Sequence, residues 1–246
     1  MKLLMLDIEC APNTAHVWGL WKQTVSIKQL MESSYTMCFA AQWYGSKKVI
    51  FKDQYDEDML TTLWHLLNEA DAVVHYNGTK YDIPTINKDF LLAGLTPPSP
   101  YKQVDLYRIV RSKFKFPSNK LDYVAERLGV GNKHAHEGHE LWVKCMAGDR
   151  AAWRRMKKYN KQDVVLLRGV YDELLPWMDN HPNHALYSPH DFCCPNCGSR
   201  DLIKQGLAYT QAMTYQQYKC KGCGKWSRAR LSEKGAKKAI LTSQRS

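Results

Sequence analysis

Residues 3–9 read Leu-Leu-Met-Leu-Asp-Ile-Glu, an apolar run that ends in two acids. An apolar run of this length is typical of a buried strand. Successive side chains of a strand point to opposite faces, so Asp7 and Glu9 share one side of the sheet. The two carboxylates repel each other unless a cation lies between them, and a divalent ion with oxygen ligands fits this role. Taken alone, the pair is also compatible with two solvated acids at a strand end.

Strand and helix patterns alternate along the residues that follow. Strands come first and helices are interleaved later, which favours an α/β fold with a mixed sheet and helices on its faces. Strands are expected at residues 2–9, 36–44, 47–52 and 72–76, helices at 56–68, 82–94, 121–128 and 150–177, and either a strand or a helix at 104–110.

The expected helix at 150–177 carries an acid on its apolar face. A charge in line with the core costs several kcal/mol, roughly, when it has no partner. Asp is also a poor residue for a helix interior. A metal ion shared with other acids would neutralise Asp163. The stripe that contains it has spacings of four, three, four and four residues and consists of Tyr159, Asp163, Leu166, Val170 and Leu174.

Asp82 is a further acid that follows a predicted strand, after the residues His-Tyr-Asn-Gly-Thr-Lys-Tyr at 75–81. Asp is a good N-cap, so a helix-capping role is sufficient to explain it. A capping carboxylate can also face a metal ion, so the two roles are compatible.

These residues together resemble the three exonuclease motifs of the DEDD superfamily. The third motif matches the tyrosine branch, because position 158, where the histidine branch has His, is Lys. This branch includes the proofreading domains of family B DNA polymerases, and stand-alone YprB-like nucleases, some of them phage-encoded, are the most similar members. The matching residues are Asp7-x-Glu9, Asn77-x-x-x-Tyr81-Asp82 and Tyr159-x-x-x-Asp163.

The resemblance implies a ribonuclease-H-like domain that removes nucleotides from single-stranded 3′ ends. Tyr159 would orient the attacking water, because an ordinary pKa of about 10 makes it a poor base; a core tyrosine beside Asp163 is the alternative. Asn77 and Tyr81 would contact the nucleic acid. Two Mg²⁺ or Mn²⁺ ions about 4 Å apart would activate the water and stabilise the leaving 3′-oxygen. Their ligands would be Asp7, Glu9, Asp82 and Asp163.

Two Cys-x-x-Cys pairs near the end of the chain predict a structural zinc site. Four thiolates at this spacing suit tetrahedral Zn²⁺. A segment this small buries little core, so the metal would supply most of its folding energy. The expected organisation is a catalytic domain at 1–178, a linker at 179–191 and a zinc ribbon with a basic tail at 192–246. The predicted ligands are Cys194, Cys197, Cys220 and Cys223.

Positive charge is concentrated in the same region. The net charge is +11, and residues 190–246 contain eleven Lys and Arg against three Asp and Glu. Such segregation favours a nucleic-acid partner, although a solvated basic tail is the simpler alternative. Cations interleaved with aromatic residues suit phosphate contacts and base stacking. The candidates are Lys219, Lys221, Lys225, Trp226, Arg228 and Arg230.

Composition excludes some other classes of protein. The chain is 44% hydrophobic and 24% charged, without an apolar stretch of membrane-spanning length, so a cytoplasmic protein is expected. Its oligomeric state is not predicted. An RNA-processing nuclease, an endonuclease and a non-catalytic nucleic-acid-binding adaptor are alternatives; the motif order disfavours the endonuclease and the complete acid set disfavours the adaptor. DNA is favoured as substrate. His134, His136 and His139 form either a metal site or a mobile loop.

Overall fold

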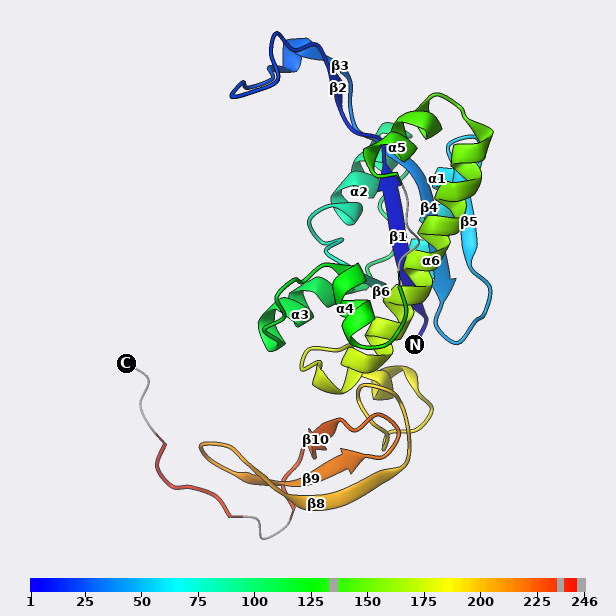
Figure 1. The fold of residues 1–246 in the computed structure, drawn as a ribbon. Coiled ribbons are helices and arrows are strands. Elements are labelled where there is room, and N and C mark those ends of the chain that lie inside the picture. Colours follow the sequence, from blue (N-terminus) through cyan, green and yellow to red (C-terminus); the bar gives the residue numbers. More distant parts are fainter. Residues whose placement is uncertain (133–136, 234–236, 243–246) are drawn as a thin grey trace. The chain divides into compact units, whose positions relative to one another are not determined.

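The computed structural model describes residues 1–132, 137–233 and 237–242, and it divides into two compact units (Figure 1). One unit comprises Lys2–Tyr171, and the other comprises Asp172–Ser246 with Met1. Within the described ranges, every helix is too short or too polar to cross a membrane.

The first unit is built on a five-stranded sheet in the order β5-β4-β1-β6-β7 (Figure 1). The middle strand, β1 (Leu3–Cys10), is antiparallel to β4 (Thr36–Trp43) and parallel to β6 (Ala72–His75). The edges are β5 (Ile50–Asp53) and β7 (Lys102–Asp105). The mixed sheet predicted from the sequence is therefore confirmed, with β1 buried in its centre.

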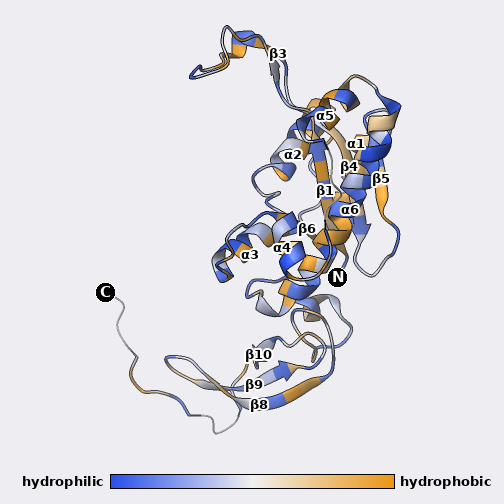
Figure 2. Ribbon diagram, viewed as in Figure 1, coloured by the Kyte–Doolittle hydropathy of each residue, from blue (hydrophilic) through white to orange (hydrophobic). Residues whose placement is uncertain are grey.

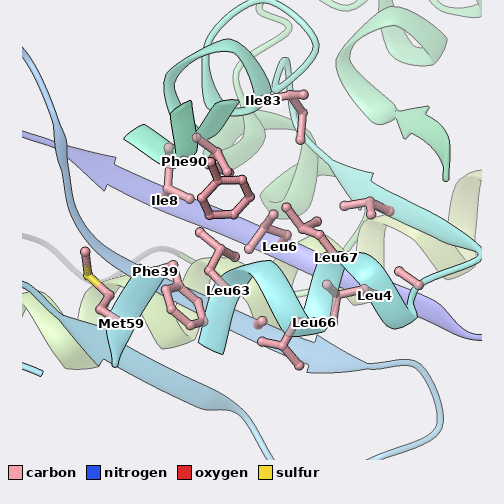
Figure 3. Close-up of a cluster of buried hydrophobic side chains, with 14 residues drawn as sticks. Leu4, Leu6, Ile8, Phe39, Met59, Leu63, Leu66, Leu67, Ile83 and Phe90 are labelled. Atoms are coloured by element: carbon pink, nitrogen blue, oxygen red, sulfur yellow. The ribbon is translucent and has the colours of Figure 1, made fainter. Parts of the chain in front are cut away.

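One face of this sheet is covered by helices α1 (Met59–Glu69) and α2 (Asp82–Leu92). Alternation along β1 sends its even-numbered residues to this face, where they meet the apolar sides of both helices. Figure 3 shows the resulting cluster, which includes Leu4, Leu6, Ile8, Phe39, Leu63, Leu67, Ile83 and Phe90.

The other face lies against helices α5 (His139–Met146) and α6 (Arg150–Leu174). Their apolar residues form a second core, which includes Met37, Leu141, Trp153, Met156 and Tyr159. The predicted stripe on α6 is confirmed: Tyr159, Asp163, Leu166, Val170 and Leu174 are all at most 8% exposed. The odd-numbered residues of β1, Asp7 and Glu9 among them, point to this side of the sheet.

Several boundaries differ from the sequence-based expectation for local reasons. Residues 104–110 contain both predicted structures, because α3 (Leu106–Lys113) follows β7 directly. Helix α6 ends at Leu174, and a 3-10 turn (Leu175–Trp177) follows because Pro176 cannot donate to the helical ladder. The short helix α4 spans Leu121–Arg127. His139 begins α5, a helix that the sequence did not predict, whereas His134 and His136 lie outside the described residues.

An arm spans residues 13–34, between β1 and β4, where the sequence predicted no element. It has two short paired strands, β2 (Thr14–Ala15) and β3 (Leu30–Glu32), and a 3-10 turn at Ile27–Gln29. A register shift between Glu9 and Cys10 marks the point where β1 leaves its regular pairing. Figure 1 shows the arm beyond the arrow tip of β1.

The second unit carries a three-stranded antiparallel sheet in the order β10-β9-β8. Its strands are β8 (Leu202–Tyr209), β9 (Thr214–Cys220) and β10 (Trp226–Arg228). A 3-10 turn at His184–Tyr187 precedes it, inside the predicted linker. The sheet and the grouped cysteines fit the predicted zinc ribbon.

Candidate metal centres and nucleic-acid surface

Three carboxylates meet where β1 faces α6. Asp7 and Glu9 come from the odd-numbered side of β1, and Asp163 comes from the buried stripe of α6. One oxygen from each residue lies within 4.8 Å of the others. Asp163 is only 2% exposed, so water screens its charge poorly. Three hard oxygen donors this close together fit a divalent cation such as Mg²⁺ or Mn²⁺.

Asn160 holds one of these acids in place and was not among the residues predicted from the sequence. Its Nδ2 donates to Asp7 Oδ2 at 2.7 Å, and the side chain is fully buried. Asn is unfavourable in a helix interior. Its position on the inner side of α6, next to Tyr159, was therefore a signal that its amide has a specific partner.

Tyr159 lies in the second core with its hydroxyl at the acid group. It is 8% exposed, and its ring meets Trp142 edge to face at 6.0 Å between centroids. Burial raises the pKa of Tyr159 above its ordinary value, and the neighbouring Asp163 carboxylate, with which the phenol forms a hydrogen bond, raises the pKa further. The phenol is therefore protonated at neutral pH and donates a hydrogen bond instead of removing a proton.

Asp82 lies apart from this group of three acids. The predicted capping role is wrong, because Tyr81 occupies the N-cap position and Asp82 is the first helical residue. Its Oδ1 instead accepts a hydrogen bond from the backbone N–H of Ile8, at 3.4 Å. Asp82 thus approaches β1 between Asp7 and Glu9. Burial raises the pKa of Asp82 to about 6.

The loop before Asp82 is fixed by two buried side chains. Asp105 Oδ1 accepts from the N–H of Asn77, which has a left-handed φ of 64°, and His75 Nδ1 accepts from Gly78 N–H at 3.1 Å. A Cβ on Gly78 would lie 2.7 Å from His75 Cγ and 3.0 Å from an Asp82 oxygen. Only glycine fits here without displacing the acid.

The four predicted zinc ligands come together in the second unit. Cys194 and Cys223 have their sulfurs 3.6 Å apart, as do Cys197 and Cys220. Thiolates at ~2.3 Å from a tetrahedral Zn²⁺ are separated by about 3.8 Å, so the spacing fits zinc. Cys193 is outside this group, because its thiol contacts the carbonyl of His190 at 3.5 Å.

One face of the ribbon sheet combines cations with aromatic rings. Lys219 Nζ lies 5.6 Å from the Trp226 ring centroid, and Arg228 lies 4.4 Å from that of Tyr215. The register pairs Trp226 with Lys219, and alternation places all four residues on the same side. The other predicted nucleic-acid contacts in the ribbon do not belong to this face. Lys225 forms a salt bridge with Asp179, and Lys221 forms one with Asp201. The Arg230 side chain is exposed. In the first unit, Tyr81 is 65% exposed.

A cavity of about 640 Å³ lies beside the start of α6, in the first unit. Its lining is mainly cationic and aromatic, which suits a phosphate group next to a base or sugar. The lining residues are Asp53, Tyr55, Gly148, Arg150, Trp153, Arg154 and Lys157.

Comparisons with known proteins agree with this architecture. Residues 6–175 match the sequence profile described as RNase_H superfamily. The fold is similar to that of the family B DNA polymerase from the hyperthermophilic archaeon Pyrobaculum calidifontis, with a TM-score of 0.56 and 20% identity. The alignment covers 72% of this chain but only 25% of the polymerase. No curated protein matches the sequence.

The acid group predicts a measurable response to divalent ions. Mn²⁺ should raise the melting temperature of the first unit, because at about a hundred times Kd a ligand stabilises the folded state by ~2.7 kcal/mol. In Asp163→Asn this shift should be lost, while the metal-free melting temperature rises because a like charge is removed. Calorimetry measures these melting temperatures. The control is Asp122→Asn, which replaces an exposed acid on α4. An equal Mn²⁺ shift in Asp163→Asn would exclude the site.

The four sulfurs predict one bound Zn²⁺ per chain. Cys220→Ser should lose the ion and unfold the ribbon sheet, because a small unit depends on its metal for folding energy. Cys193→Ser is the matched control, since this buried thiol neighbours a ligand without joining the group, and it should retain zinc. Elemental analysis of both purified variants tests this, and zinc retained by Cys220→Ser would contradict it.

Proposed function

Since the chain belongs to the RNase_H superfamily, we propose that it is a metal-dependent 3′→5′ exonuclease of the tyrosine branch of the DEDD group. Superfamily membership supports nuclease activity in general. The observation that carries the finer proposal is the acid group of Asp7, Glu9 and Asp163 with the Tyr159 hydroxyl beside it. This combination matches the third motif of that branch, in which tyrosine comes four residues before the last acid.

Asp7, Glu9 and Asp163 would hold the catalytic metal, and Asp82, which is held at the Ile8 backbone between Asp7 and Glu9, would complete the ligand set. Two Mg²⁺ or Mn²⁺ ions held by these residues would supply a water of lowered pKa and a positive charge at the leaving oxygen. The side chains of the protein fix the positions. Asn160 keeps the Asp7 carboxylate oriented, and the Ile8 N–H keeps Asp82 against the strand.

Tyr159 would orient the attacking water. Its raised pKa keeps the phenol protonated, so proton removal falls to another group. With its proton donated to Asp163, the phenol oxygen would accept a hydrogen bond from the water, and such positioning raises the rate by fixing the geometry of the reacting atoms. Burial in the second core limits the motion of the ring and preserves this geometry.

The proposed substrate is a single-stranded 3′ end, with DNA favoured. The cation–aromatic face of the ribbon supports contacts with a flexible strand, since aromatic rings stack on bases of any sequence. The cationic cavity beside α6 supports a phosphate contact in the catalytic unit. Discrimination against RNA would require contacts with the 2′-hydroxyl.

Incubation of 5′-labelled single- and double-stranded DNA and RNA with Mg²⁺ or Mn²⁺ tests the activity. The wild type should give a ladder that shortens from the 3′ end, fastest on single-stranded DNA. Asp7→Ala should abolish the ladder, because it removes a ligand, whereas Asp122→Ala should not. A ladder on RNA alone would instead indicate an RNA-processing nuclease. Binding without cleavage would indicate an adaptor.

Tyr159→Phe removes only the hydroxyl beside Asp163. Single-turnover hydrolysis should slow by about 10²-fold or more, the loss expected when a reacting group is no longer held in position, with little change in substrate binding. Tyr171→Phe is the matched control, because Tyr171 is also buried on α6. Equal rates in the wild type and Tyr159→Phe would leave Tyr159 as a packing residue.

A further inference from the structure

The arm at residues 13–34 leaves the sheet at the end of β1 that carries the acids. Glu9 and the start of β2 at Thr14 are separated by only four residues. The base of the arm is held by the pairing of β2 with β3 and by Ser34 N–H, which donates to Asn13 Oδ1 at 2.7 Å. Its position is therefore tied to the acid group through a short covalent connection.

The outer part of the arm exposes two tryptophans. Trp18 is 99% exposed and Trp21 is 87% exposed, whereas Trp153 in the core is 8% exposed. Figure 2 shows apolar residues, in orange, elsewhere on the same arm. A tryptophan offers ~150–250 Å² of surface for burial, and exposed apolar patches mark interaction sites.

The charge of the arm identifies the kind of partner. Residues 13–34 contain Lys22, Lys28 and His16 against a single acid, Glu32, which lies at the base of the arm on β3. Indole rings combined with cations suit a single strand of nucleic acid, in which every base offers a face for stacking and every phosphate a negative charge. The short connection to Glu9 places this combination on the same unit as the proposed cutting site.

We propose that the arm binds the unpaired bases of the substrate strand by stacking on Trp18 and Trp21, with Lys22 and Lys28 contacting phosphates. This inference rests on the proposed function, because the arm would bind the same strand whose 3′ end reaches the acids. It also assigns a reason for the single-strand preference: the faces of paired bases inside a duplex are already stacked.

The test measures binding in the Asp163→Asn background, in which hydrolysis does not interfere. The fluorescence anisotropy of a labelled oligothymidine gives the Kd of three proteins: one with the unaltered arm, one with both tryptophans replaced by Ala and one with both replaced by Phe. Replacing Trp18 and Trp21 together with Ala should weaken binding roughly 30-fold or more, since stacking contributes at least ~1 kcal/mol per base. Replacing both with Phe should restore most of the affinity.

Two controls separate stacking from other causes. The pair Leu20→Ala and Ile27→Ala changes equally exposed residues of the arm, 83% and 84% exposed, and should leave Kd unchanged. A blunt duplex should bind equally to all forms. Unchanged oligothymidine affinity in the Trp-to-Ala variant would overturn the proposal, and so would loss of affinity in the Leu–Ile variant alone, because the strand would then not be held by the tryptophan rings. Because no cleavage is measured, failure of the nuclease proposal would be seen separately.

Discussion

Electrostatic repulsion among three carboxylates within 4.8 Å is the constraint on which the rest of the first unit depends. Such a group holds its geometry only if the surrounding structure prevents the acids from spreading apart. Two of the acids are fixed by β1, because β4 pairs with it at both Asp7 and Glu9. The third is fixed by α6, whose apolar stripe is buried along its length. The packing of the two hydrophobic cores thus offsets the repulsion within a polar site that is unfavourable by itself.

The local periodicity of the sequence determines how much of the fold and of the candidate sites could be predicted. Alternation along β1 was sufficient to put Asp7 and Glu9 on one face, and helical spacing was sufficient to bury Asp163. The cysteine spacing was sufficient to group the four thiols. The tether of Asp82 to Ile8 N–H and the support of Asn77 by Asp105 join residues far apart in sequence, so no periodic pattern encodes them. The arm was not predicted, because its residues follow neither the two-residue period of a strand nor the 3.6-residue period of a helix.

The two candidate metal sites offer different ligand chemistry in one chain. Carboxylate oxygens suit hard cations, whereas thiolates suit zinc, so the two units would select different ions from the same solution. Their roles differ accordingly. Zinc-bound thiolates would hold together a unit with little apolar core, whereas the carboxylates lie in a unit that has two cores of its own. Loss of zinc should therefore affect folding, whereas loss of the carboxylate-bound ion should affect the proposed chemistry.

The arm is inserted between β1 and β4, two strands that are direct neighbours in the sheet. Its two ends are consequently close together, and a loop between such ends can lengthen or shorten at a cost of only ~0.6 kcal/mol per doubling. Residues 159–163 have no such freedom, since one added residue would rotate Asp163 by about 100° around α6. The proposed substrate-binding arm can therefore vary through insertions and deletions. The acid group can vary only by substitution. The arm is accordingly the natural place to graft a new binding preference onto this scaffold.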